Sequence, residues 1–279
     1  MKKLFTTYYE QKRFAEPSPD YFPALTGRGE RGILWHTMLG PWRKHFLNLI
    51  YPLFCLLCKV KLHPLSDKPL CDICWSKIEF NLPPYCRICG RHLPAPSQNQ
   101  VLLCQDCHKR RYFFSAAHSV CVYDGIIKEC IHLLKYNRKL ALVGPLSELL
   151  FDFSRRYLDL SACDLIIPVP LHRAKLRQRQ FNQAALLAAA LGRAYSKESA
   201  EKILIKIIPS PAQVKLSQKQ RLRNVRGAFK VRSGRLLKEK NVLLVDDVLT
   251  TGATVNECAK TLLEAGCARV NVLTLACSR

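Results

Sequence analysis

The chain has 279 residues and a 48% hydrophobic content, which suffices for one or two domains with packed cores. Its formal net charge of +23 opposes self-association and favours polyanions: nucleic acid first, an anionic membrane surface second, small phosphorylated ligands third. The first residues lack the apolar region of a secretory signal, and the apolar segment 46–58 is too short to cross a bilayer. These features argue against a secreted or membrane-spanning protein, and we expect a soluble intracellular one.

The N-terminal segment 1–37 is polar, rich in Pro, Gly and charge, and has no clear period. We expect it to be weakly ordered, or translation to start at Met38, the only other methionine. Residues 38–54 combine a basic cluster with apolar residues and predict a short amphipathic lead-in helix. Two interpretations of this helix stay open, packing on the module that follows and attachment to a membrane surface.

Eight of the fourteen cysteines form four C-x-x-C pairs, spaced C-x2-C-x12-C-x2-C and then C-x2-C-x14-C-x2-C. This clustering suits zinc in a reducing compartment better than disulfides. Two C-x-x-C turns complete a tetrahedral site without an open position, so we predict two structural zinc ions in tandem ribbons. The predicted ligands are Cys55, Cys58, Cys71, Cys74, Cys86, Cys89, Cys104 and Cys107. An interleaved pairing, redox pairs and an iron–sulfur cluster stay open as alternatives.

A basic cluster, residues 108–111, closes the cysteine region and is followed by three aromatic residues, 112–114. Basic residues beside aromatics are suited to a nucleic-acid single strand, because cations contact phosphates while rings stack on bases. The alternative is an interdomain hinge whose aromatic side chains pack inward.

From residue 116 onward the pattern becomes α/β. Strands are predicted at 117–123, 163–169, 202–208, 242–245 and 269–276. Helices are predicted at 126–135 and 145–158. A third helix is opened by the segment 168–183 and ends at about 194, and a fourth follows the stretch 242–254 and ends at 265. Residues 209–240 are basic and broken. Strands that alternate with helices indicate a mostly parallel sheet with ligands at the carboxyl ends of its strands.

The most informative stretch follows the apolar run 242–245, where two adjacent carboxylates precede a loop of hydroxyls and one glycine. A loop between a buried strand and a helix N-terminus is suited to phosphate, because backbone N–H groups and the helix dipole favour an anion. Two carboxylates would repel phosphate alone, but they suit a ligand that also carries hydroxyls. The stretch therefore predicts a sugar-phosphate site.

This stretch resembles the PRPP-binding signature of the type I phosphoribosyltransferases, in which an acidic pair precedes T-T/S-G-x-T. The matching residues are Asp246, Asp247, Thr250, Thr251, Gly252 and Thr254. The resemblance implies that residues 250–254, Ala253 included, bind the ribose 5-phosphate of PRPP. It implies that Asp246 and Asp247, the catalytic candidates, accept hydrogen bonds from the ribose hydroxyls. Magnesium accompanies the pyrophosphate of such a ligand.

Three segments together resemble the ComF family of competence proteins: the paired cysteine knuckles, P-V-P-L-H…R…R-x-F-N-Q at 168–183, and N-V-R-G-A-F at 224–229. Ile131, Leu134, Lys135 and Tyr136 are similar to that family's I-x-x-L-K-Y segment. The resemblance covers about residues 50–279. It implies a double zinc ribbon, here 38–111, and a phosphoribosyltransferase-type domain, here 112–279, with helices on both faces of its sheet and a hood.

Two groups of cations are candidates for contacting pyrophosphate or DNA. Arg173, Lys175, Arg177 and Arg179 follow the predicted strand 163–169, at the usual place of a pyrophosphate loop. Arg221, Arg223 and Arg226 fall in the predicted hood. The alternative for both groups is a solvated basic surface.

Three functions stay open. The one we favour follows from the family resemblance: handling of incoming single-stranded DNA during natural transformation, in the cytoplasm or at the inner face of the membrane. A competence helicase and DNA-processing proteins are then candidate partners, and the net charge and ribbons support this function because base salvage needs neither. The second is a metabolic phosphoribosyltransferase of the nucleobase-salvage type, which both intact acids support. The third is a zinc-ribbon adaptor that only bridges partners.

Overall fold

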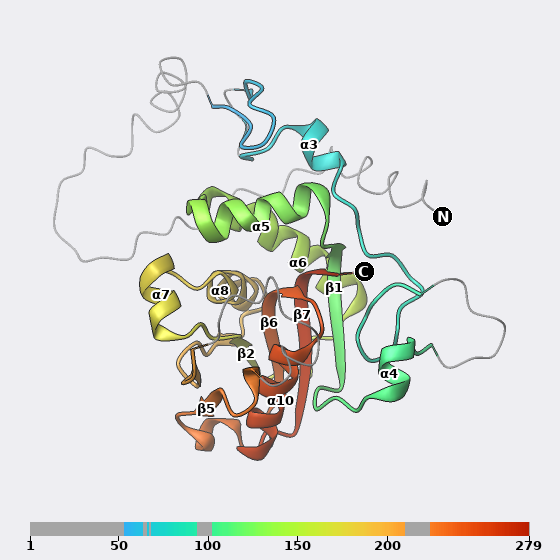
Figure 1. The fold of residues 1–279 in the computed structure, drawn as a ribbon, viewed down its shortest axis with the longest axis vertical. Coiled ribbons are helices and arrows are strands. Elements are labelled where there is room, and N and C mark those ends of the chain that lie inside the picture. Colours follow the sequence, from blue (N-terminus) through green and yellow to red (C-terminus); the bar gives the residue numbers. More distant parts are fainter. Residues whose placement is uncertain (1–52, 64–65, 67, 94–101, 210–223, 279) are drawn as a thin grey trace. The chain divides into compact units, whose positions relative to one another are not determined.

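A computed structural model describes residues 53–63, 66, 68–93, 102–209 and 224–278, all within one compact unit, His45–Arg279 (Figure 1). The predictions for segment 1–37, for a start at Met38 and for nearly all of the lead-in helix lie outside these ranges. So do two residues of the predicted hood, Arg221 and Arg223.

A five-stranded sheet forms the centre of this unit, in the order β1-β7-β6-β2-β3. Every neighbouring pair in it is parallel. The strands are β1 (Ala116–Val122), β2 (Leu165–Pro168), β3 (Glu198–Ser199), β6 (Asn241–Leu249) and β7 (Arg269–Cys277). The predicted α/β class with a mostly parallel sheet is therefore confirmed.

Both faces of the sheet are covered, which explains why its central strands are continuously apolar. On β6, Leu243 and Val245 belong to a core cluster with helices α5 (Gly125–Asn137), α6 (Val143–Tyr157) and α8 (Gln183–Tyr195). The alternate residues Val242 and Leu244 belong to a second cluster with α10 (Ala253–Glu264). Figure 1 shows these helices on the two sides of the strands.

The segment that was expected to open one long helix instead forms two. A short helix, α7 (Arg173–Arg179), ends at Gln180 in the left-handed conformation, with φ 71°. Asn182 then caps α8, because its side-chain oxygen accepts a hydrogen bond of 3.1 Å from the Ala184 N–H. An asparagine at this position starts a new helix rather than continuing an old one.

Two short strands lie outside the main sheet. β4 (Leu204–Lys206) and β5 (Phe229–Val231) form a separate antiparallel pair. β4 is shorter than the predicted strand 202–208. The described residues also include two 3-10 helices, η3 (Leu140–Leu142) between α5 and α6 and η5 (Gly234–Leu237) between β5 and β6.

The cysteine-rich region carries two short helices, α3 (Asp72–Ser76) and α4 (Gln105–Lys109), and docks closely on β1. The Ala117 N–H donates to the Ile88 carbonyl at 2.7 Å, and the buried Asn81 side chain donates to the carbonyls of Gly90 and Ser119. Gly90 has φ +66°, and a Cβ atom there would lie 2.2 Å from the Ala117 carbonyl oxygen. Only glycine permits so close a contact.

Candidate functional site

Each set of four cysteines brings its sulfur atoms together. The Sγ atoms of Cys58 and Cys71 lie 3.5 Å apart and those of Cys89 and Cys104 lie 3.7 Å apart, while all sulfurs of a set lie within 4.8 Å. A tetrahedral zinc site with Zn–S bonds of about 2.3 Å has edges of about 3.8 Å. A disulfide would need about 2.05 Å. The geometry fits two zinc sites that group consecutive knuckles, at 55–74 and 86–107.

Backbone N–H groups around the knuckles favour the thiolate form that binds metal. Burial raises the pKa of Cys55, but hydrogen bonds from the backbone of Cys71 and Cys58 outweigh it and lower the pKa to about 6. The same balance lowers the pKa of Cys86 to about 7. Each set therefore contains a thiol prepared to lose its proton at neutral pH.

The acid pair lies within β6, ahead of the hydroxyl loop as predicted. The strand passes its predicted end at residue 245, because Asp246, Val248 and Leu249 all continue the parallel pairing with β7. Adjacent strand residues point to opposite faces, so the two carboxylates have different surroundings. Asp247 is 5% exposed and Asp246 is half-buried.

Asp247 is paired with a lysine from α5. The Lys135 ammonium lies 2.5 Å from Asp247 Oδ2, and the side chains of the two residues are 15% and 7% exposed. Burial lowers the pKa of Lys135, but Asp247 outweighs burial and leaves that pKa above its ordinary value. Lys135 is therefore a charged, internal counter-ion of the acid pair.

Asp246 has different neighbours. Burial, followed by the adjacent Asp247, raises the pKa of Asp246 to about 7. Lys135 and Lys206 act in the opposite direction, and the Asp247 N–H donates a 2.8 Å hydrogen bond to Asp246 Oδ1. The site can thus change its charge near neutral pH.

Further cations surround the acids. Burial lowers the pKa of Lys175 on α7, and Arg179 and Lys135 lower it further. Burial also lowers the pKa of Lys206 on β4, with a smaller contribution from Lys175. Lysines whose charge is disfavoured in this way would be stabilised by an anionic ligand.

The predicted phosphate loop connects β6 to α10. Gly252 caps the helix with φ +74°, and the Ala253 N–H donates to Thr251 Oγ1 at 3.4 Å. Thr254 lies half-buried in the first turn of α10. The loop thus presents hydroxyls and the N-terminus of a twelve-residue helix beside the acids.

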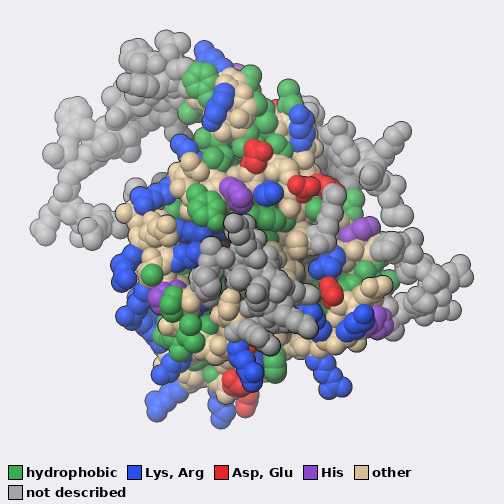
Figure 2. Space-filling view, viewed as in Figure 1, with side chains coloured by type: hydrophobic (Ala, Val, Ile, Leu, Met, Phe, Trp, Pro, Cys, Tyr) green, Lys and Arg blue, Asp and Glu red, His purple; other side chains and the backbone are tan. Residues whose placement is uncertain are grey.

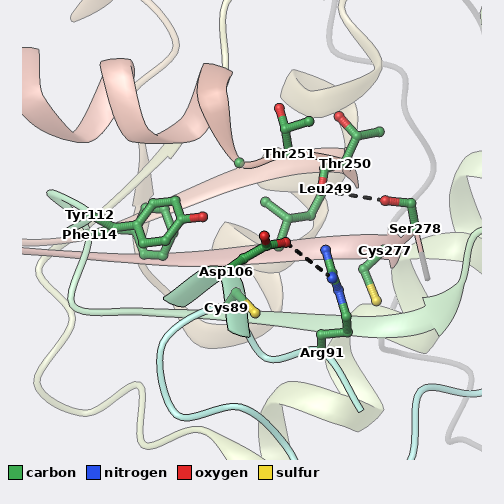
Figure 3. Close-up of a pocket in the computed structure, with 11 residues that line it drawn as sticks. Cys89, Arg91, Asp106, Tyr112, Phe114, Leu249, Thr250, Thr251, Cys277 and Ser278 are labelled. Atoms are coloured by element: carbon green, nitrogen blue, oxygen red, sulfur yellow. Dashed lines mark hydrogen bonds and ion pairs between the residues drawn. The ribbon is translucent and has the colours of Figure 1, made fainter. Parts of the chain in front are cut away.

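A pocket lies against this loop, walled by the second ribbon, Tyr112, Phe114 and the ends of β6 and β7 (Figure 3). The Arg91–Asp106 ion pair of the ribbon, at 3.6 Å, lines it together with Tyr112 and Phe114. The Phe113 N–H also donates to Asn256 Oδ1 of α10 at 2.6 Å. The second ribbon and the segment after it thus support the phosphate loop.

The predicted aromatic and arginine groups divide between buried and exposed positions. Phe114 is 3% exposed and stacks near Tyr112, as the hinge interpretation expects, whereas Phe113 is 46% exposed. Arg179 is buried and donates to Gln183 Oε1 at 3.1 Å. The exposed members of the cationic groups are Arg173, Arg177 and Arg226.

Lys135 was predicted only as part of the I-x-x-L-K-Y resemblance, without a role, and Lys206 was not predicted as a site residue. Lys135 follows Leu134 on the buried side of α5, so a lysine beside an otherwise apolar helix face was the available signal. Its partner is more than a hundred residues away in sequence, which no local pattern shows.

Among the described residues, no helix is both long and apolar enough to cross a membrane. Lys and Arg side chains occupy much of the face in Figure 2, where acidic groups are few.

Two family models match the chain. A double zinc ribbon domain matches residues 46–121, and a phosphoribosyl transferase domain matches residues 184–279. These matches agree with the paired cysteine sets and with the parallel sheet that carries the acid pair.

Relatives match nearly their full length. DNA utilization protein YhgH of Shigella flexneri is 31% identical over 230 residues, covering 81% of this chain and 98% of that protein. Competence protein F of Haemophilus influenzae is 30% identical, covering 80% and 96%. Competence protein ComFC of Bacillus subtilis is 29% identical, covering 81% and 95%.

Among solved structures, the glutamine PRPP amidotransferase of B. subtilis is 20% identical, with a TM-score of 0.34, over 48% of this chain and 26% of that one. The hypoxanthine-guanine phosphoribosyl transferase of L. donovani is 12% identical, with a TM-score of 0.27, over 47% and 67%.

Proposed function

The chain belongs to the ComF family, and from that premise we propose that it handles single-stranded DNA and binds a PRPP-type sugar phosphate. The proposed location is the cytoplasm or the inner face of the membrane. Competence and DNA utilization are the roles named for its relatives. A net charge of +23 supports a polyanionic partner.

The observation that carries the sugar-phosphate part is the arrangement of β6 and its loop. Asp246 and Asp247 occupy the carboxyl end of a central strand, and residues 250–254 follow at the N-terminus of α10. In this proposal the loop binds the 5-phosphate, and the carboxylates accept hydrogen bonds from the ribose hydroxyls. Lys175 and Lys206 lie on elements beside the acids and contribute positive charge toward the pyrophosphate.

Magnesium fits this proposal as a companion of the ligand. Lys135 already balances Asp247, so the protein does not present two free carboxylates for a resident divalent ion. When bound, the ion would neutralise pyrophosphate oxygens. The protein's own contribution is to orient the sugar and to hold its phosphate in the loop.

The test is to measure binding of a fluorescent 20-nucleotide single strand against salt, with and without PRPP and magnesium. We expect affinity to fall steeply with salt, because cations that contact phosphates displace counterions. A salt-independent affinity, or no binding, would contradict the DNA part. PRPP binding measured separately by calorimetry would then decide the sugar-phosphate part alone.

A salvage-type phosphoribosyltransferase is the second candidate, and the retention of both acids favours it. Its test is pyrophosphate release from PRPP with a panel of free bases and with single-stranded DNA. Turnover with a free base would support this enzyme. PRPP binding without turnover would support a sensor or a DNA-handling module.

A further inference from the structure

A second surface beside the acid site has the chemistry of a single-strand platform. It is formed by the C-terminal end of α5, the residues that follow it, and α7. We call it the α5–α7 surface, and its members are Tyr136, Arg138, Lys139, Leu140, Arg173, Leu176 and Arg177.

Tyr136 is the central feature of this surface. It is 64% exposed although it is a large aromatic residue. The buried Arg179 places its guanidinium 5.2 Å from the ring centroid, and the His132 ring meets it edge-on at 5.6 Å. The ring is therefore held in place while a large part of it faces solvent.

The two elements of the surface are tied together by Arg138. Its guanidinium donates to Gln180 Oε1 at 2.8 Å and to the Gln178 carbonyl at 3.2 Å. Arg138 and Gln180 both adopt the left-handed conformation that ends their helices. The ends of α5 and α7 thus form one surface before any ligand arrives.

Exposed apolar side chains and cationic side chains lie together on the α5–α7 surface. Leu140 is 51% exposed and Leu176 is 38% exposed. Arg138, Lys139, Arg173 and Arg177 are exposed around them, and the sequence has no Asp or Glu at 130–147 or 165–197. Exposed rings and aliphatic groups among cations suit unpaired bases joined by phosphates, whereas a duplex keeps its base faces stacked inside.

The α5–α7 surface also adjoins the acid site. Lys135, the neighbour of Tyr136 in α5, reaches inward to Asp247. The charge of Asp247 likewise acts on Lys175 of α7, because it raises the pKa of that lysine against the effect of burial. A DNA strand on this surface would therefore pass close to the acid pair.

We propose that the α5–α7 surface binds single-stranded DNA by stacking a base on the exposed face of Tyr136, with the surrounding arginines contacting phosphates. This inference rests on the proposed function and gives the DNA a location. It predicts that Tyr136 acts through its ring, and that Arg177 acts through its charge.

The test compares Tyr136→Ala, Tyr136→Phe and Arg177→Gln in the full chain, with Ile73→Ala, on an exposed position of α3, as the matched control. Tyr136→Ala should weaken binding of a 20-nucleotide single strand about tenfold, the loss expected for one base stack. Tyr136→Phe and Ile73→Ala should bind like the wild type. Arg177→Gln should reduce the slope of log affinity against log salt by about 1, while Tyr136→Ala leaves it unchanged.

A covalent readout locates the contact directly. An oligonucleotide carrying 5-iododeoxyuridine, irradiated in the complex, should crosslink to Tyr136, as mass spectrometry of the peptides would show. Crosslinking confined to other elements would overturn the proposal. So would unchanged affinity in Tyr136→Ala, or an equal loss for duplex DNA of the same length. If the wild type binds no single strand at all, the DNA part of the proposed function fails as well, while PRPP binding is unaffected.

Discussion

The buried ion pair between Lys135 and Asp247 offers the sharpest prediction about the acid site. In Lys135→Met the side chain keeps a similar length but loses its charge, so Asp247 becomes an unpaired buried anion. At the observed 2.5 Å and an effective dielectric constant of about 20, the direct attraction is about 7 kcal/mol. Most of it offsets the desolvation of the two charges, and removing one partner of such a pair costs about 3–5 kcal/mol.

We therefore expect Lys135→Met to lower the free energy of unfolding at pH 7 by about 3–5 kcal/mol. Urea denaturation at pH 7 measures this loss. Lys128→Met, at an exposed position of the same helix, is the matched control and should change the free energy by no more than about 0.5 kcal/mol.

A double-mutant cycle isolates the pair. Adding Asp247→Asn to Lys135→Met removes the orphaned charge, so the double variant should regain part of the lost stability and give a coupling energy above about 2 kcal/mol. Additive single effects, with coupling below about 0.5 kcal/mol, would refute the reasoning. That result would mean that Lys135 and Asp247 are not paired in solution.

Three further predictions concern the rest of the site. The pKa of Asp246 is raised to about 7, so PRPP affinity should rise between pH 6 and pH 8 as the Asp246 carboxylate forms. Dividing the wild-type affinity by that of Asp246→Asn at each pH removes the effect of the ligand's own titration. A ratio that does not change with pH would count against this role. Gly90→Ala should destabilise the chain by about 3 kcal/mol, since its new Cβ meets the Ala117 carbonyl at a positive φ, and thermal unfolding would show it. Metal analysis should find two zinc ions per chain. Removing them with a chelator should weaken PRPP binding, because the second ribbon packs beside the phosphate loop. Unchanged PRPP affinity in the zinc-free protein would contradict that link.

The features that sequence predicted well are local. Cysteine spacing determines which thiols lie on one knuckle. Apolar runs such as 242–245 predict buried strands without any knowledge of the strands that will pair with them. The acid pair and the threonine loop are likewise contiguous, so their proximity needed no knowledge of the fold.

The features that sequence did not predict depend on tertiary contacts. Lys135 contacts Asp247 only because α5 packs on the face of the sheet that carries Leu243 and Val245 of β6. The break between α7 and α8 depends on Gln180 adopting φ 71° and on Asn182 turning its side chain to the new helix. A helical pattern that continues through polar residues predicts neither the left-handed conformation of Gln180 nor the capping by Asn182.

The length of β6 was underestimated for a related reason. Aspartate is a poor strand former, but Asp246 pairs with Thr274 of β7, and the pairing continues at Val248 and Leu249. Pairing with a neighbouring strand overrode local preference there, as is common at functional sites.

The measurement that tests the central claim most directly is calorimetric binding of PRPP with magnesium to the wild type and to Asp246→Asn/Asp247→Asn. The substitutions keep the shape of the side chains and remove the charges that would accept hydrogen bonds from the ribose hydroxyls. We expect at least about a hundredfold loss, since two charge-assisted hydrogen bonds contribute about 3 kcal/mol or more. Glu201→Gln, at an exposed turn, should bind like the wild type. Equal affinity in the acid-pair variant and the wild type would contradict the assignment of this strand and loop as the sugar-phosphate site.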